Sequence, residues 1–181
     1  PGAIQEFRPT FLVAVPKIWD IIKKGVEDTL GKKSPVVSYL FSLAFAARAW
    51  AISQGRDTPL FNKVVFKRLT AMVGGRMRAG ASGGGPISSE VQTFIRTAFC
   101  MPLVQGYALT ETCCAGGCAQ KIYDMRDGVV GQPFSSCEIL LNNCPEFTDN
   151  DCKPYLNCDT VHKGEKVAGR GEVWIRGPTI A

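Results

Sequence analysis

The chain has 181 residues, of which 45% are hydrophobic and 20% are charged, and its formal net charge is +5. This composition is typical of one or two globular domains, and the chain contains no internal repeat or low-complexity tract. Lys and Arg cluster at 17–33 and 63–78 without interleaved aromatic residues, which argues against a nucleic-acid surface. A solvated basic face is the simplest interpretation, and attraction to anionic ligands or lipid head groups is the alternative.

The first predicted element is a strand over residues 9–15, which Pro16 ends. Residues 17–30 then show helical spacing of apolar side chains, and Gly31 ends this helix. The apolar positions that define its buried side are Ile18, Ile21, Ile22, Val26 and Leu30.

A second helix is predicted over residues 34–53, with Pro35 at its first position. Its residues are apolar on nearly every side, which favours a buried or semi-buried helix. A helix on a membrane surface, or one that lines an acyl tunnel, is the second interpretation. A membrane span is the third, because a span needs about 20 apolar residues and Arg48 interrupts this run.

A short helix is predicted over residues 60–70, after which two glycine-containing segments follow. Beyond them the pattern changes to short strands at 137–141 and 171–175, without helices between them. Residues 142–168 are polar, contain Pro145 and Pro154, and are predicted to form a long loop. The expected fold class is therefore α/β, with layered sheets and flanking helices, followed by the start of a small β subdomain.

Residues 106–112 read Gly-Tyr-Ala-Leu-Thr-Glu-Thr and follow an apolar run, 101–104, that is predicted to be a buried strand. Gly106 allows close backbone approach, and Tyr107 offers a flat face on which a base can stack. The Thr110 hydroxyl can donate to a phosphate oxygen, and Glu111 can hold a hard cation such as Mg²⁺. The alternative is an ordinary strand-to-loop turn with a surface Glu.

Residues 79–89 read Ala-Gly-Ala-Ser-Gly-Gly-Gly-Pro-Ile-Ser-Ser, after a predicted strand over 76–79. Ser88 or Ser89 is expected to cap a helix that begins near Glu90. A strand, a glycine turn and a capped helix together bring backbone amides against a nucleotide. The alternative is a plain glycine loop, and no Walker Gly-Lys-Ser/Thr sequence follows.

These motifs together carry a family resemblance. The order and spacing of 82–88, 105–112, 128–131 and 171–178 resemble those of the adenylate-forming enzymes, which include acyl-CoA synthetases, luciferases and adenylation domains. The segments 7–10, 15–20 and 66–68 are most similar to long-chain fatty acyl-CoA synthetases of the fungal type. The resemblance covers the whole chain apart from roughly residues 142–168.

The resemblance implies a role for each motif residue. Gly83, Gly84, Gly85 and Pro86 would form the wall beside the adenine of ATP, and Gln105 and Gly106 would continue it. Tyr107 would stack on the purine, and Ala108 would lie beside the nucleotide. Thr110 would hydrogen-bond the α-phosphate, and Glu111 would bind Mg²⁺. Gly131 and Arg176 are expected to be structural.

The resemblance also implies the reaction and its partners: a long-chain fatty acid, ATP and CoA, joined through an acyl-adenylate. Another adenylate-forming acid ligase and a non-catalytic nucleotide- or acyl-binding relative are the alternatives. An intracellular location is implied, with peripheral association on the cytosolic face of the endoplasmic reticulum, peroxisome or lipid droplet. Ala108 stands where the family usually has glycine, which puts full activity or substrate chain length in question. Gly85 stands where alanine is common, which is a milder change.

In domain terms, residues 1–127 are expected to be a partial AMP-binding α/β region. Residues 128–181 are expected to be the start of a β-barrel-like subdomain. The chain begins without Met, and by the resemblance it is a central fragment. The phosphate loop and the C-terminal domain with its catalytic Lys are expected outside it, so the fragment alone is predicted to be inactive.

The eight cysteines contain no C-x2-C pair, which argues against a zinc ribbon, and free thiols are expected. One metal-site alternative remains open, a Cys3His set in the predicted long loop. Its members would be Cys144, Cys152, Cys158 and His162. His162 is the only histidine, and in a polar loop we expect it to be exposed to solvent.

Overall fold

A computed structural model describes residues 2–113 and 116–181, and these residues fall into two units. The first unit comprises residues 1–107 and 119–132, and the second comprises residues 108–118 and 133–181. The chain therefore passes between the units more than once. The expected domain boundary between residues 127 and 128 stays a prediction.

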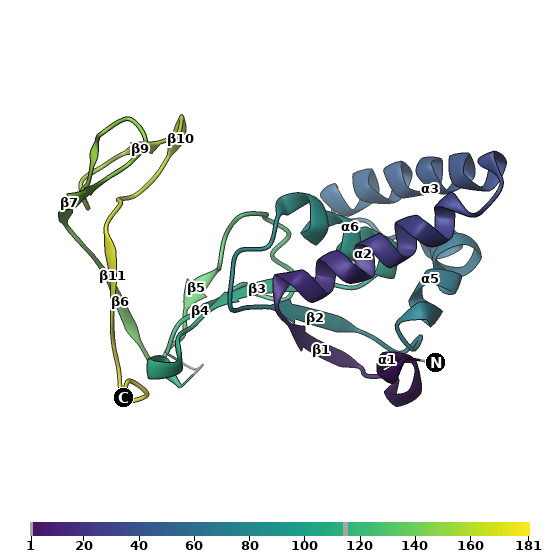
Figure 1. Ribbon diagram of the computed structural model, residues 1–181, viewed down its shortest axis with the longest axis horizontal. Helices are drawn as coiled ribbons and strands as arrows, with labels where there is room; N and C mark the ends of the chain where they lie inside the picture. Colours follow the sequence, from purple (N-terminus) through teal and green to yellow (C-terminus); the bar gives the residue numbers. More distant parts are fainter. Residues whose placement is uncertain (1, 114–115) are drawn as a thin grey trace. The chain divides into compact units, whose positions relative to one another are not determined.

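The first unit is an α/β unit (Figure 1). Its helical elements are α1 (Ala3–Phe7), α2 (Pro16–Gly31), α3 (Pro35–Ser53), α4 (Pro59–Phe61), the π-helical turn η1 (Asn62–Phe66), α5 (Lys67–Met72) and α6 (Ser89–Phe99). Its strands are β1 (Phe11–Ala14), β2 (Ala79–Ser82) and β3 (Leu103–Tyr107). Two short strands, β4 (Cys118–Ala119) and β5 (Gln132–Pro133), lie where the chain passes between units.

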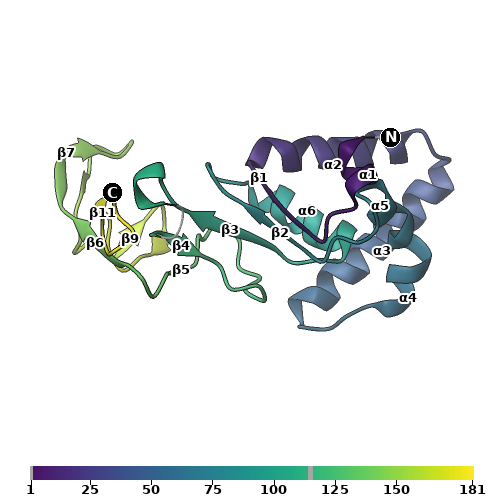
Figure 2. The same ribbon diagram turned by 90° about the horizontal axis from the view of Figure 1, so that it is seen from below.

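The strand order of the sheet is β1-β2-β3-β4-β5, and β1, β2 and β3 run parallel. Ser82 is level with Ala14 on one side and with Gln105 on the other, so the carboxyl ends of all three strands meet at one edge. Helices α2, α3 and α6 lie on one side of these strands (Figures 1 and 2). The predicted α/β class is confirmed.

The core of the first unit lies between these helices and the strands. Trp19 of α2 lies over β2 so closely that a Cβ on Gly80 would sit 2.7 Å from its ring. This contact explains why β2 has glycine at position 80. The largest fully buried side chains of the unit are those of Trp19, Phe66, Ile95, Leu103 and Gln92.

Several predicted boundaries shift. The strand expected over 76–79 begins at Ala79 and continues to Ser82. Gly80, which the sequence placed in the glycine turn, lies in this strand under Trp19. The strand expected over 101–104 runs to Tyr107. Gln105, Gly106 and Tyr107 are therefore strand residues and not turn residues.

Helix α3 covers the predicted residues and is semi-buried, because one side packs against the core and the other is exposed. Only Ala44, Arg48 and Ala51 are buried along it. By length and composition α3 could cross a membrane, with a mean hydropathy of 1.4 and 17% of its most apolar window buried. Core helices of soluble proteins can have the same length and composition.

The second unit is mainly β structure. Its elements are the 3-10 helix η2 (Thr110–Thr112), β6 (Glu138–Asn142), β7 (Cys144–Thr148), β8 (Pro154–Tyr155), β9 (Val161–His162), β10 (Glu165–Lys166) and β11 (Glu172–Arg176). Strands β6 and β11 pair antiparallel, as do β7 with β8 and β9 with β10. The prediction of one long loop over 142–168 was wrong, because this polar segment contains four strands.

Candidate nucleotide site

The glycine loop, residues 83–86, lies at the carboxyl edge of the parallel strands. A Cβ on Gly83 would lie 3.8 Å from the Gly106 carbonyl oxygen, and one on Gly84 would lie 3.6 Å from Val15. The Gly83 amide donates to the Ala14 carbonyl at 3.3 Å. The loop therefore contacts the ends of both neighbouring strands, at the edge where α/β sheets bind ligands.

The backbone explains part of the glycine content. Gly84 has φ +76°, which an L-residue adopts only with strain. Gly85 has no such requirement, and a Cβ there would make an ordinary contact with Pro16 at 3.8 Å. Gly84, Gly85 and Pro86 are exposed, so the surface of the loop is open to a ligand.

Helix α6 starts immediately after the loop. The Ser88 hydroxyl accepts from the Val91 amide at 3.2 Å, which confirms the predicted N-cap. The first turn of this 11-residue helix thus faces the same edge of the sheet as the loop. Helix N-termini carry partial positive charge and unpaired amides, which suit an anionic ligand.

Gln105 holds this edge together from inside. Its Oε1 accepts from the Ile87 amide at 3.0 Å, and its Nε2 donates to the Val129 carbonyl at 3.1 Å. The residue is only 3% exposed. Its side-chain amide is therefore fully engaged with the protein, and it ties the glycine loop to the 128–131 motif.

Two further glutamines, which the sequence reading missed, extend this network. Gln120 Oε1 accepts from the Gln105 amide at 2.8 Å and from Gln92 Nε2 at 3.0 Å. Gln120 Nε2 donates to the Arg126 carbonyl at 2.7 Å, and Gln92 Nε2 also donates to the Leu103 carbonyl. The sequence held one indication of this network: Gln92 is a polar residue on the apolar side of α6.

Arg96 of α6 anchors the segment that leads into the 128–131 motif. Its Nη1 lies 2.9 Å from Asp127 Oδ1 and donates to the Met125 carbonyl, while its Nε donates to the Leu103 carbonyl. Burial lowers the pKa of Arg96, and the carboxylates of Asp127 and Asp124 oppose this shift. Because the guanidinium is enclosed and paired, it acts as a structural clamp.

Gly131 has a steric reason to be glycine. Its φ is +88°, and a Cβ would lie 2.0 Å from the Ala119 carbonyl oxygen. This contact agrees with the expected structural role. Ala108, the position where the family usually has glycine, is half-buried and is not among the non-glycine residues with positive φ. The backbone at Ala108 therefore accepts its methyl group without strain.

Tyr107 is the last residue of β3 and is half-buried. It follows Gly106 directly, so it ends the strand next to the one that leads into the glycine loop. Among the predicted site residues, the first unit thus gathers Gly83 to Pro86 with Gln105 to Tyr107 at one sheet edge.

Thr110 and Glu111 belong to the second unit, on η2, and both are exposed. Thr112 fixes this turn: its buried Oγ1 accepts from the Leu109 amide at 2.9 Å. Neither the Thr110 hydroxyl nor the Glu111 carboxylate hydrogen-bonds any other described residue. Both groups are therefore available to a ligand.

The Cys3His alternative receives no support. No three His, Cys, Asp or Glu side chains within 2–113 and 116–181 are placed to share a metal ion. Cys144 is buried on β7 and its thiol donates to Glu146, while His162 is half-buried. The expectation of a solvent-exposed histidine was therefore wrong, because Nδ1 of His162 lies 3.1 Å from Arg170 Nη1.

Arg170 organises the segment that was expected to be a loop. Its guanidinium bonds Asp149 at 2.6 Å and Asp159 at 2.7 Å, and it lies over the Tyr155 ring. Hydrogen bonds from the Lys153 amide and Arg170 lower the pKa of Asp149. Arg170 is also the main cause of the lowered pKa of Asp159. These paired charges stabilise strands too short to be stable alone.

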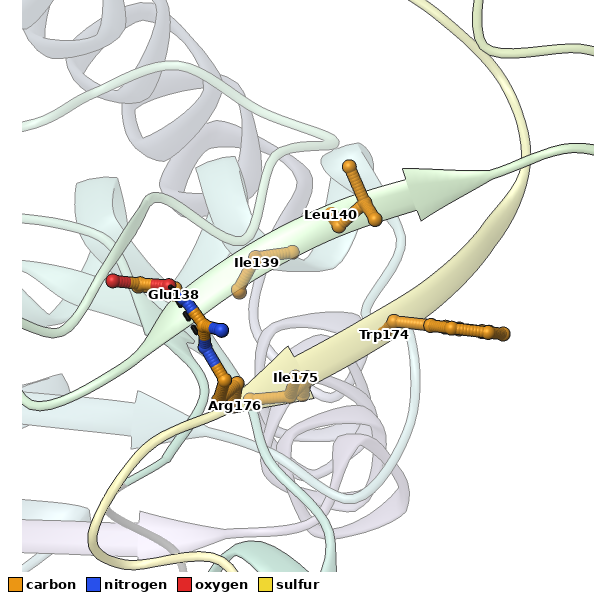
Figure 3. A pocket seen from close by; sticks show the side chains of 6 residues that line it. All are labelled: Glu138, Ile139, Leu140, Trp174, Ile175 and Arg176. Atoms are coloured by element: carbon orange, nitrogen blue, oxygen red, sulfur yellow. Dashed lines mark hydrogen bonds and ion pairs between the residues drawn. The ribbon is translucent and has the colours of Figure 1, made fainter.

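A cavity of about 440 Å³ lies along β6 and β11 in the second unit (Figure 3). Its walls are Glu138, Ile139, Leu140, Trp174, Ile175 and Arg176. Arg176 reaches across the strand pair, and its Nε donates to Glu138 Oε2 at 3.0 Å. This ion pair agrees with the expected structural role of Arg176, and the cavity contains none of the predicted site residues.

A glycine turn at the carboxyl ends of parallel strands is typical of nucleotide-binding α/β proteins. The family model described as AMP-binding enzyme matches residues 1–181. The chain therefore belongs to the AMP-binding enzyme family.

The similar proteins agree with this membership. Fatty acyl-CoA synthetase A of Dictyostelium discoideum is 35% identical over 96% of this chain and 24% of its own length. Peroxisomal long chain acyl-CoA synthetase 7 of Arabidopsis thaliana is 33% identical over 96% of this chain and 23% of its own. The A domain of a carboxylic acid reductase from Segniliparus rugosus, solved in complex with AMP, shares the fold with a TM-score of 0.52. It is 22% identical over 98% of this chain and 22% of that chain. The chain spans about a quarter of the curated relatives it matches.

Proposed function

We propose that the protein containing this chain is a long-chain fatty acid:CoA ligase that forms AMP. One observation carries the proposal: the glycine loop and Gly106–Tyr107 lie at adjoining strand ends in a chain that the AMP-binding family matches throughout. The names of the curated relatives support a fatty acid as the substrate class.

The nucleotide would lie along the sheet edge. Gly83, Gly84, Gly85 and Pro86 would approach the adenine, because the glycines lack side chains and the loop is exposed from Gly84 to Pro86. Gly106 would continue this wall, and Tyr107 would stack on the purine. Gln105 would act indirectly by fixing the Ile87 end of the loop.

Thr110 and Glu111 would serve the phosphates. The Glu111 carboxylate is an exposed hard oxygen donor with no partner among the described residues, which fits Mg²⁺. Mg²⁺ is commonly held by one or two carboxylates together with substrate phosphates. Bound there, it would offset phosphate charge, and the Thr110 hydroxyl would donate to an α-phosphate oxygen.

The family resemblance implies two chemical steps. A carboxylate oxygen of the fatty acid attacks the α-phosphorus of ATP, and the bond to pyrophosphate breaks. The CoA sulfur then attacks the acyl carbonyl carbon, AMP leaves, and the thiol proton passes to solvent. Catalysis of the first step rests on positioning and charge neutralisation, which the open loop and the exposed acid and alcohol suit.

The full-length protein is needed to test the proposal, because the 181-residue chain spans only a quarter of its relatives. Palmitate-dependent exchange of labelled pyrophosphate into ATP should be measured, with short-chain and aromatic acids for comparison. A ligase for another acid would prefer one of those acids, and a non-catalytic relative would exchange none. Exchange that requires a long-chain acid supports the proposal.

The residue roles need a matched pair of variants. Glu111→Gln should lower exchange by at least about 100-fold, in the range of one lost charge-stabilising group. Glu165→Gln is the control, because Glu165 is an exposed glutamate of the same unit on β10. Equal rates in the two variants would remove Glu111 from the site.

By the same resemblance we propose an intracellular location, with CoA as the second acceptor substrate and peripheral attachment to the cytosolic face of an organelle. Two of the curated relatives carry the word peroxisomal in their names, which supports an intracellular setting. Fractionation of cells that express the full-length protein tests this part.

A further inference from the structure

Helix α3 has two apolar sides, and only one of them packs against the core. On the inner side, Phe41 contacts the Phe66 ring with centroids 6.0 Å apart, and Phe45 contacts Phe94 at 5.4 Å. Arg48 also lies on this side and donates to the Thr97 carbonyl at 3.0 Å. These contacts fix which side of α3 faces the protein.

The other side of α3 is an exposed apolar stripe. Its members recur every three or four residues, so they share one helix face. They are Val36, Tyr39, Leu40, Leu43, Ala47 and Trp50. Their large side chains are between 50% and 67% exposed, and α3 runs along the margin of the first unit (Figure 1). This stripe contains no charged residue.

The segment around the stripe is strongly basic. Residues 32–89 contain nine Lys or Arg and a single acidic residue, Asp57. Asp57 is already paired, since its Oδ1 lies 3.0 Å from Arg48 Nη1. Six of the basic residues are exposed at the ends of α3 or on the next helical run: Lys32, Lys33, Arg56, Lys63, Lys67 and Arg68. These six cations have no unpaired carboxylate within residues 32–89, and the nearby Glu27 and Glu90, which line a pocket with Phe45, are paired with Lys23.

The helical run after α3 repeats this combination. Leu60 is 80% exposed and Val64 is 77% exposed, and Lys63 and Lys67 are their close neighbours in sequence. Apolar side chains interleaved with cations suit an interface with hydrocarbon below and anionic head groups above. Tyr39 and Trp50 are of the aromatic types that favour this boundary.

We propose that the outer face of α3 is a peripheral docking surface for an anionic lipid bilayer. The helix lies in the plane of the interface: Val36 to Trp50 enter the head-group boundary, and the flanking lysines and arginines bind phosphate groups. The helix does not cross the bilayer, because its inner side is held by Phe66, Phe94 and the bonds of Arg48. This deepens the membrane attachment in the proposed function but does not depend on ligase activity.

The test uses the full-length protein and two kinds of vesicle, phosphatidylcholine alone and phosphatidylcholine with 30% phosphatidylserine. The parent should sediment with the anionic vesicles and dissociate as salt rises, because exposed charges are screened. Leu40→Asp with Leu43→Asp should lower the partition coefficient by at least about tenfold, since two apolar contacts are lost. Brominated lipid should quench parent fluorescence more than that of Trp50→Phe.

Val13→Asp is the matched control, because Val13 of β1 is 66% exposed and alternates along the strand with Leu12 and Ala14, which pack against the core. It should bind vesicles as the parent does. Palmitate-dependent pyrophosphate exchange without lipid should be unchanged in the Leu40/Leu43 double variant, so a failure of the ligase proposal would be seen separately.

Three results would overturn the docking surface. In the first, the double variant binds anionic vesicles as tightly as the parent. In the second, it melts at a lower temperature or changes oligomeric state without lipid, which means that protein covers the stripe. In the third, the double variant prefers a different acid from the parent in pyrophosphate exchange measured without lipid, which means that the stripe lines an acyl tunnel.

Discussion

Replacing Gln105 by methionine should loosen the glycine loop without removing any group that faces the ligand. Methionine has a similar length but offers no strong donor or acceptor. The Ile87 amide and the Val129 carbonyl would each lose the partner that now lies 3.0 Å and 3.1 Å away. The variant therefore changes how firmly the loop is held in place but leaves the groups that face the ligand unchanged.

The size of the effect follows from burial. Ile87 is 5% exposed, so water cannot readily replace the lost acceptor. A buried unpaired amide costs about 1–3 kcal/mol, and the half-buried Val129 carbonyl adds less. If this cost appears as easier local opening, the Ile87 amide should exchange its hydrogen about 5- to 150-fold faster.

Hydrogen exchange in the full-length protein, resolved for a peptide spanning 83–91, measures this directly. Gln54→Met is the control, because Gln54 is exposed at the end of α3. Under the proposed function, the KM for ATP should rise in Gln105→Met more than kcat falls. An Ile87 amide that exchanges as slowly as in the parent would refute the clamp.

Two further predictions concern the loop glycines and the Arg170 cluster. Gly84→Ala should destabilise the first unit by about 1–2 kcal/mol because φ is +76°. Gly85→Ala should be neutral or stabilise by up to about 1 kcal/mol, and identical urea midpoints would contradict this contrast. The second unit should lose stability as pH falls below about 4. The pKa values of Asp149 and Asp159 are lower in the folded protein than the usual 3.8. Their ion pairs therefore stabilise the fold above pH 3.8, and this stabilisation is lost as the pH falls through the lower folded pKa. In acid titrations Asp159→Asn should weaken this dependence, and an unchanged titration curve would argue against it.

Local chemistry made part of the fold predictable. Ser88 caps α6 as expected, because an N-cap depends only on residues within one turn. The strands β1, β6 and β11 and the helix α2 follow from apolar spacing over a few residues. The two glycine-containing motifs were recognisable in the sequence, because only residues without a bulky side chain let another group come close to the backbone.

The parts that sequence could not supply depend on distant partners. β2 looked like a glycine turn until Trp19 was seen to pack over Gly80. Hairpins within 142–168 form because Arg170 reaches Asp149 and Asp159, which no short window reveals. The sequence predicted a buried or semi-buried α3 but not which side is covered, because apolar content does not show whether a partner covers a given face.

The strand pairing of the first unit also sets an order of assembly. Only α6 and its short connections separate β2 from β3 in the chain. By contrast, β1 pairs with β2 across a much longer segment, from Phe11 to Ala79. Closing the larger loop costs more chain entropy, so β2, α6 and β3 can form first and β1 joins later. During synthesis β1 therefore emerges long before its partner, and its unpaired edge, which carries Phe11 and Val13, is open to aggregation or chaperone capture until β2 pairs with it.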